Sequence, residues 1–185
     1  MKLDKRSKIF LIIFFSIILI PVIIIGTINY TKEQELQNRI ENSKATRILT
    51  LNNISTAITL DELLKIEISK EYNIKGNELK YDNDSTKKDF TVEYTNTSFY
   101  GSHCIMEYYF VDEKLKRCIF TIDTSHWQPK DIYEELSKIN GIPDETEIDS
   151  DSFYLETYTW YGKNGTITYN KLNNDTIEVF FEILN

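Results

Sequence analysis

The stretch that decides the fold reads Phe153-Tyr-Leu-Glu-Thr-Tyr-Thr-Trp-Tyr161, then Thr166-Ile-Thr-Tyr-Asn-Lys-Leu172, then Thr176-Ile-Glu-Val-Phe-Phe-Glu-Ile-Leu184. Apolar and polar residues alternate in each segment, as expected of strands with one buried face. Asn164-Gly165 is a strong signal for a two-residue hairpin turn, and Asn173-Asn174-Asp175 predicts the next turn. The sequence therefore predicts a three-stranded antiparallel meander. Its register places Trp160, Tyr169 and Val179 in line, Ile167 beside Phe181, and Tyr158 beside Ile177.

The same alternation predicts a second meander upstream. Its strands are Phe90 to Tyr94, His103 to Val111 and Lys116 to Asp123, with turns at Tyr100-Gly101-Ser102 and Asp112-Glu113-Lys114. With Gly101 and Glu113 at the turn centres, Val92 lies opposite Phe110, Tyr94 opposite Tyr108, Tyr108 opposite Cys118, and Met106 opposite Phe120. One face then collects the apolar residues, which favours this register. These residues are Phe90, Val92, Tyr94, Cys104, Met106, Tyr108, Phe110, Cys118, Phe120 and Ile122.

A helix is predicted before each meander. Thr59-Leu60-Asp61-Glu62 forms a capping box, so the first helix should begin at Leu60 and end near Tyr72. Pro129 suits the first position of a second helix, which ends near Asn140 with Gly141 as its C-cap. The expected buried faces are Leu60, Leu63, Leu64 and Ile68 in the first helix, and Ile132, Tyr133, Leu136 and Ile139 in the second.

These elements predict an α+β fold of two similar halves, about 59–123 and about 130–185. Because neither half alone has much core, we expect both meanders to join edge to edge in one antiparallel sheet. Both helices should then cover the same face of that sheet.

The N-terminal part of the chain contains an uncharged apolar run from Ile9 to Ile28. A helix of that length spans about 30 Å, the thickness of a bilayer core. Lys2, Lys5, Arg6 and Lys8 precede the run, and positive flanks stay in the cytoplasm. The sequence thus predicts a cytoplasmic flank at 1–8, a single transmembrane helix at 9–28 that contacts lipid, a solvated stalk at 29–54 and an extracellular domain at 55–185. A cleaved signal, which would give a secreted protein, is the alternative, but no Ala-x-Ala site follows the run.

The net charge of the chain limits which classes of macromolecule can be its partner. The whole chain has a formal charge of −8, and the positive flank leaves the remainder more acidic still. An acidic domain repels nucleic acid, so we expect no nucleic-acid partner.

Part of the second half resembles a known group of domains. The segment Leu136-Ser-Lys-Ile-Asn-Gly-Ile-Pro143, followed by Tyr158-Thr-Trp-Tyr161 before the Asn164-Gly165 turn, is similar in order and spacing to the β-lactamase-inhibitor-protein-like domains and the related SmpA/OmlA (BamE) domains. The first half lacks both the Gly-x-Pro and the Trp, and no lipid-bearing Cys follows the apolar run. The resemblance implies a tandem helix-plus-meander fold and a non-enzymatic binding role.

Catalytic, cofactor and metal motifs are not found in the sequence. Cys104 and Cys118 are the only cysteines; buried thiols and a disulfide both stay open, although our register separates the two residues beyond disulfide reach. His103 and His126, the only histidines, are expected in exposed loops, since no nucleophile or ligand motif accompanies them. The acids Asp144, Glu145, Glu147, Asp149 and Asp151 are expected to form a solvated loop. An extracellular enzyme acting on cell-wall material, using acids near Asp149 and His126, is the alternative function, and a structural subunit of a membrane complex is another.

The leading function is binding of a protein or peptide on the outer side of the sheet. Strand alternation places Leu155, Tyr161, Leu172 and Phe180 on the face opposite the core, among Thr157, Thr159, Thr168, Glu178 and Glu182. Exposed apolar patches with a polar rim mark interaction sites. The predicted contact residues are Tyr161, Phe180, Leu155, Leu172, and the loop aromatics Trp127 and Tyr100.

Overall fold

The computed structural model describes residues 5–51, 54, 57–66, 71–76, 89–124, 129–151, 153–172 and 175–184. The chain divides into two compact units, Met1–Glu41 and Asn42–Asn185. The first unit is helical and belongs to α1 (Lys5–Thr46), which contains Pro21. The second unit holds the last turn of α1, two further helices and the whole sheet.

The predicted transmembrane helix is wrong. Within the described part of the chain, no helix combines the length and apolar character that a bilayer crossing requires. The physical reason is that a crossing takes about 20 predominantly apolar residues, whereas the later part of α1, from Tyr30 to Thr46, is polar and carries Lys32 and Glu33. The single-pass placement, with a cytoplasmic N-terminus and an extracellular domain, is therefore overturned, and so is the fold class that included it.

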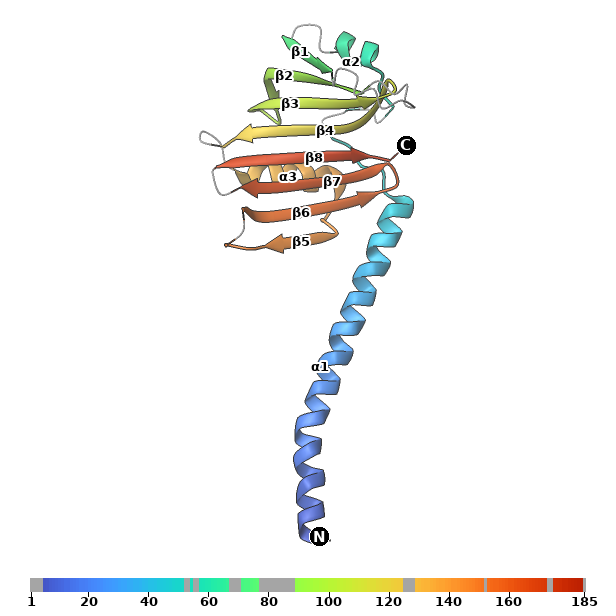
Figure 1. Ribbon diagram of the computed structural model, residues 1–185, viewed down its shortest axis with the longest axis vertical. Coiled ribbons are helices and arrows are strands. Elements are labelled where there is room, and N and C mark those ends of the chain that lie inside the picture. Colours follow the sequence, from blue (N-terminus) through green and yellow to red (C-terminus); the bar gives the residue numbers. More distant parts are fainter. Residues whose placement is uncertain are drawn as a thin grey trace, which may run out of the picture. The chain divides into compact units, whose positions relative to one another are not determined.

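The sheet has eight antiparallel strands in the order β1-β2-β3-β4-β8-β7-β6-β5 (Figure 1). The two predicted meanders are β2–β4 and β6–β8, and they join edge to edge through β4 and β8. Two strands were not predicted, β1 and β5, and they form the two edges. The strands are β1 (Tyr72–Gly76), β2 (Asp89–Phe99), β3 (Ser102–Val111), β4 (Lys114–Asp123), β5 (Glu145–Ile148), β6 (Tyr154–Gly162), β7 (Gly165–Leu172) and β8 (Thr176–Ile183).

The register of the first meander is partly as predicted. The pairs Tyr108–Cys118 and Met106–Phe120 are confirmed. Between β2 and β3 the prediction is wrong by two residues, because Val92 pairs with Tyr108 and not with Phe110. The turn is the two-residue Tyr100-Gly101, both with positive φ, and a bulge between Tyr94 and Thr97 shifts the remaining pairs.

The register of the second meander shows a similar shift at one hairpin. Tyr169–Val179 and Ile167–Phe181 are confirmed, but Trp160 pairs with Ile167, so its predicted alignment with Tyr169 is wrong. The loop residues are Lys163 and Asn164, because Gly162 pairs with Gly165. Both glycines lie in close contact with neighbouring segments of the chain. A Cβ on Gly165 would lie 2.1 Å from the Glu182 carbonyl oxygen, and one on Gly162 would lie 2.6 Å from Leu49 Cγ.

Both predicted helices are present. The capping box is confirmed at the start of α2 (Leu60–Ile66): the Thr59 amide donates to Glu62 Oε2 at 2.9 Å, and the Glu62 amide donates to Thr59 Oγ1 at 3.3 Å. The predicted end near Tyr72 is wrong, since Tyr72 begins β1; Ile68 lies outside the described residues. Helix α3 (Pro129–Asn140) ends as predicted at Gly141, whose φ is +81°.

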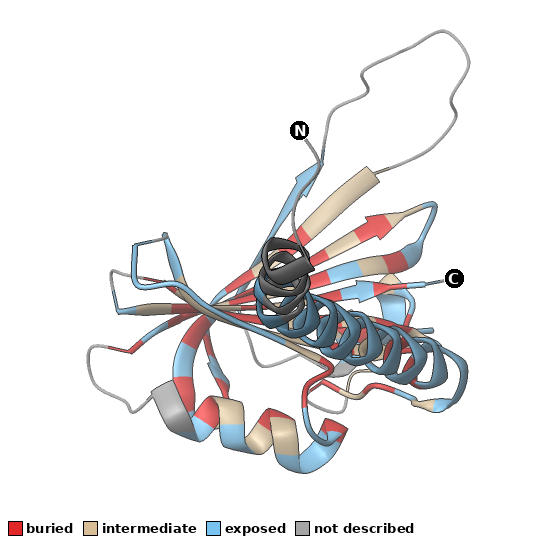
Figure 2. Ribbon diagram, turned by 90° about the horizontal axis from the view of Figure 1, so that it is seen from below, coloured by how far each residue is buried: buried red, intermediate tan, exposed pale blue. Residues whose placement is uncertain are grey.

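One apolar core occupies a single face of the sheet, and both α2 and α3 contribute to it. Buried and exposed residues alternate along the strands (Figure 2). In α3, Ile132 and Leu136 are buried, but Ile139 is 46% exposed, so its predicted place in the core is wrong. Leu49 and Leu51 are buried in the same core. The compact unit therefore includes chain that we expected to be a solvated stalk ahead of a domain starting at residue 55.

The two cysteines are separate buried thiols. Cys104 pairs with Ile122 and Cys118 with Tyr108, which leaves them four residues apart along neighbouring strands. Burial raises the pKa of the Cys118 thiol, so the unreactive protonated form prevails. The sequence left both a disulfide and two free thiols open, and the structure contains two free thiols.

Candidate functional site

The segment at residues 47–51 is bound to the sheet and to α3 by two asparagine side chains. The Leu49 amide donates to Asn164 Oδ1, and Asn164 Nδ2 donates to the Leu49 carbonyl, both at 2.8 Å. Asn140 makes the equivalent pair of hydrogen bonds to Thr50. The Thr50 amide donates to Asn140 Oδ1 at 2.9 Å, and Asn140 Nδ2 donates to the Thr50 carbonyl at 3.0 Å. Each side-chain amide therefore replaces the peptide group of a neighbouring strand. We call residues 47–51 the strap.

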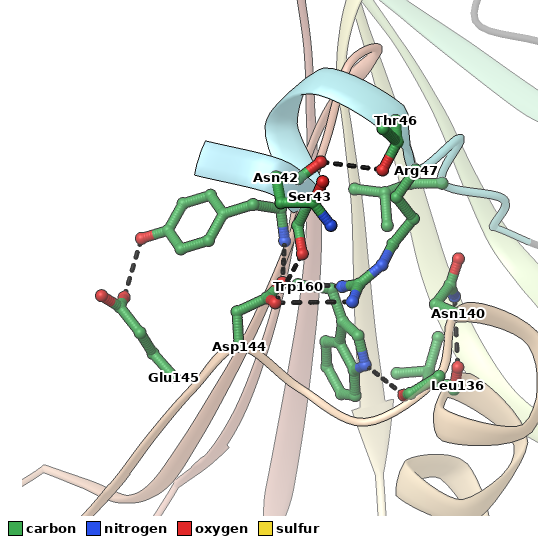
Figure 3. Close-up of polar contacts among 12 residues, drawn as sticks. Asn42, Ser43, Thr46, Arg47, Leu136, Asn140, Asp144, Glu145 and Trp160 are labelled. Atoms are coloured by element: carbon green, nitrogen blue, oxygen red, sulfur yellow. Dashed lines mark hydrogen bonds and ion pairs between the residues drawn. The ribbon is translucent and has the colours of Figure 1, made fainter. Parts of the chain in front are cut away.

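A buried carboxylate lies at the beginning of the strap (Figure 3). Asp144 is only 1% exposed and accepts from Arg47 Nη1 at 2.6 Å and from Ser43 Oγ at 2.8 Å. Its Oδ2 also accepts from the Tyr161 amide at 2.8 Å. The three donors come from the last turn of α1, the strap and β6. A buried carboxylate needs such partners, because the free energy that it loses by leaving water must be offset by ion pairs and hydrogen bonds.

The cluster of Asp144, Arg47, Ser43 and the Tyr161 amide acts as a structural clamp. Both Asp144 oxygens are already occupied by donors, so neither is directed at a bound molecule. The turn that carries Asp144 is held from a second side, because Trp160 Nε1 donates to the Gly141 carbonyl at 2.7 Å. The Gly-Ile-Pro turn and the aromatic strand, which were singled out in the sequence, are thus in direct contact.

Tyr161 is engaged in the same region. Its hydroxyl donates to Glu145 Oε2 at 2.7 Å, and Lys44 Nζ lies 4.5 Å from the centre of its ring. Burial, followed by the hydrogen bond to Glu145, raises the pKa of Tyr161 to about 12. The predicted contact residue Tyr161 is therefore held by internal contacts on its own face of the sheet.

Of the residues proposed for enzyme chemistry, the structure describes the acids but not His126. His103 is exposed on β3, while His126 lies outside the described residues. Asp149 accepts from the Asp151 amide in an exposed turn. The acidic stretch is not the solvated loop that we expected, since Asp144 is buried and Glu145–Ile148 forms β5. Among the described residues no group of His, Cys, Asp or Glu side chains is placed to hold a metal ion.

The side of the sheet opposite the core is here called the outer face. It consists of the alternate strand residues that do not enter the core, and α3 lies behind the sheet when this face is viewed (Figure 1). Ile119 on β4 is the cross-strand neighbour of Phe180 on β8. Ile105 on β3 is 38% exposed and pairs with Thr121, which lies two residues from Ile119 along β4 and therefore on the same face. We call Ile105, Ile119 and Phe180 the apolar centre.

The predicted contact residues fall into different environments. Phe180 is half-buried on the outer face, as alternation predicted. Leu155 is also half-buried, but it lies at the bulge between Tyr154 and Glu156. Leu172 is only 5% exposed, although it lies outside the main core cluster. Tyr100 packs on Phe99, with ring centres 4.5 Å apart, and so belongs to the core margin. Trp127 lies outside the described residues.

Sequence reasoning missed Ile105 and Ile119. Both alternate with core residues on strands that were predicted, so strand parity alone could have placed them on the outer face. Their proximity to Phe180 could not be found that way, because it depends on the pairing of β4 with β8 across the two halves.

Carboxylates surround the apolar centre. Glu107 is the cross-strand neighbour of Ile119, while Glu178 and Glu182 flank Phe180 on β8. Glu182 forms an ion pair with Arg117 at 2.7 Å. Burial raises the pKa of Glu178, which means that water solvates this carboxylate incompletely.

Comparison with known proteins yields no relative. No family model matches the chain, no curated protein matches it, and no solved structure matches it.

Proposed function

We propose that this protein is a non-enzymatic binding module that holds a protein or peptide against the outer face of its sheet. The observation that supports the proposal is the apolar centre: Ile119 and Phe180 are neighbours on the face away from the core, and Ile105 lies beside them. Apolar side chains with a polar rim are the usual composition of an interaction surface. The resemblance of the second half to the β-lactamase-inhibitor-protein-like domains is consistent with binding rather than catalysis.

Selection of peptides from a random display library on the full-length protein tests the proposal. The selected peptides should bind at least about tenfold more weakly to the Ile119→Thr/Phe180→Thr variant, since a few central apolar contacts carry most of an interface's affinity. Threonine is chosen because it is well accommodated in strands.

The matched control is Ile139→Thr, which removes an exposed apolar side chain from α3 on the other side of the sheet. Its binding should equal that of the unmodified protein. Thermal unfolding of each variant separates a lost contact from a lost fold. Selected peptides that bind the double variant and the control equally well would refute an outer-face interaction.

A further inference from the structure

The outer face carries an excess of negative charge. Its carboxylates include Glu107, Asp123, Glu145, Glu147 and Glu178, which strand alternation places on this face. Lys75 and Arg117, cations of the same face, already form ion pairs with Glu93 and Glu182. The field in front of the apolar centre is therefore negative.

The position of the acids matters more than their number. Glu107 lies directly across from Ile119, and Glu178 is two residues from Phe180 on the same side of β8. Side chains in such positions are about 5–8 Å apart. A lysine or arginine one or two residues from an apolar anchor in a partner can thus reach a carboxylate while the anchor contacts Ile119 and Phe180.

The incomplete solvation of the Glu178 carboxylate favours a partner that brings positive charge beside it. Burial raises the pKa of its carboxyl group, so the charged form is less stable there than in water. A cation brought beside it would stabilise the charged form, because opposite charge lowers the pKa of a carboxyl group.

We propose that the partner of the outer face is a cationic protein or peptide segment that places an apolar side chain on Ile119 and Phe180 and basic side chains beside Glu107 and Glu178. This inference rests on the proposed function and specifies its ligand. A second copy docking through the same face would oppose acidic surfaces, and nucleic acid would be repelled; both would meet like charge.

Three synthetic 15-residue peptides test the proposal on the full-length protein. The first alternates lysine with isoleucine, the second alternates glutamate with isoleucine, and the third alternates lysine with glycine. Dissociation constants are measured by fluorescence anisotropy at low and high salt. We expect the lysine–isoleucine peptide to bind most tightly, and less tightly at high salt because exposed charge pairs are screened.

Charge variants show whether the binding is local. Glu107→Gln/Glu178→Gln should weaken the lysine–isoleucine peptide by about fivefold, since exposed ion pairs each contribute modestly. The matched control Glu113→Gln/Asp131→Asn removes two exposed acids from the β3–β4 turn and the first turn of α3. It makes the same change in net charge and should leave binding within about twofold.

The outcomes separate this inference from the proposed function. Equal weakening by both charge variants means that only net charge matters, and it overturns the inference. Preferred binding of the glutamate–isoleucine peptide, lost in Ile119→Thr/Phe180→Thr, also overturns the inference but leaves an outer-face binding module in place. If no peptide binds in a way that depends on Ile119 and Phe180, both the inference and the proposed function are overturned.

Discussion

Arg47 and Asp144 form an ion pair at 2.6 Å across 97 positions of sequence, with the Asp144 side chain 1% exposed. The pair joins the strap to the turn that precedes β5. Together with Ser43 and the Tyr161 amide, it holds the end of α1, the strap and β6 in one arrangement. This contact makes residues 42–51 part of the domain.

Removal of the Asp144 charge should destabilise the domain strongly. Asp144→Asn keeps the shape of the side chain but leaves the Arg47 guanidinium partly buried without its counter-charge. Breaking a buried pair from one side costs about 3 kcal/mol or more, and urea unfolding should show that loss. The control Asp151→Asn, in an exposed turn, should change the free energy of unfolding by less than about 0.5 kcal/mol. Equal stability of the two variants would contradict a clamp.

Removal of either asparagine side chain should weaken the attachment of the strap only at the residue that this side chain binds. Asn164→Ala removes the acceptor of the Leu49 amide, and Asn140→Ala removes the acceptor of the Thr50 amide. Each variant should lose about 1–3 kcal/mol of stability, because a buried backbone group is left without its partner. Native-state hydrogen exchange should accelerate at the Leu49 amide in the first variant and at the Thr50 amide in the second. Acceleration spread equally over the whole sheet would instead indicate global destabilisation.

Two glycines with positive φ should respond very differently to alanine. At Gly165 the added Cβ would lie 2.1 Å from the Glu182 carbonyl oxygen, so β7 and β8 must separate locally. We expect a loss of more than about 3 kcal/mol. At Gly101 nothing lies within 4 Å of the new Cβ, and the cost should be about 1 kcal/mol, from the φ of +86° alone. Thermal melts compare the two variants, and a similar loss in both would show that close approach is not the reason for Gly165.

Alkaline pH should weaken the fold through two partly buried tyrosines, Tyr158 and Tyr161. Burial raises the pKa of Tyr158 and of Tyr161 from 10.0 to about 12, with hydrogen bonds to Glu156 and Glu145 adding to it. A group whose pKa is raised in the folded state stabilises the fold fully below its unfolded pKa. That stabilisation is lost as pH rises through the folded pKa, here from about 10 to about 12.

Urea titrations at a series of pH values across this window measure the effect. The free energy of unfolding should fall with pH, by up to about 1.4 kcal/mol per pH unit for each group. Tyr158→Phe/Tyr161→Phe should flatten the fall, whereas Tyr154→Phe, which changes a more exposed ring on β6, should not. An unchanged slope in the double variant would assign the alkaline effect to other groups.

The predictive power of the sequence differed between elements for physical reasons. The capping box at Thr59 and Glu62 and the Gly141 C-cap are local, because the partners lie within one helical turn. The edge strand β1, in contrast, has no residue alternation that buries one side, since all five of its residues are exposed. The apolar run at residues 9–28 led to a transmembrane prediction because its length and lack of charge suit a bilayer crossing, and that prediction is wrong for the described part of the chain.

Residue alternation and helix caps were therefore sufficient to locate α3, both meanders, their core faces and the outward position of Phe180, since these patterns depend on neighbours in the chain. The pairing of β4 with β8, the bulge that shifts β2, and the contacts of Asp144 and Asn164 with residues 97 and 115 positions away come from packing alone. Such contacts form only when the whole core closes, because each ordered contact must outweigh a large loss of chain entropy. The apolar centre belongs to this second group: Ile119 and Phe180 become one surface only through the β4–β8 pairing.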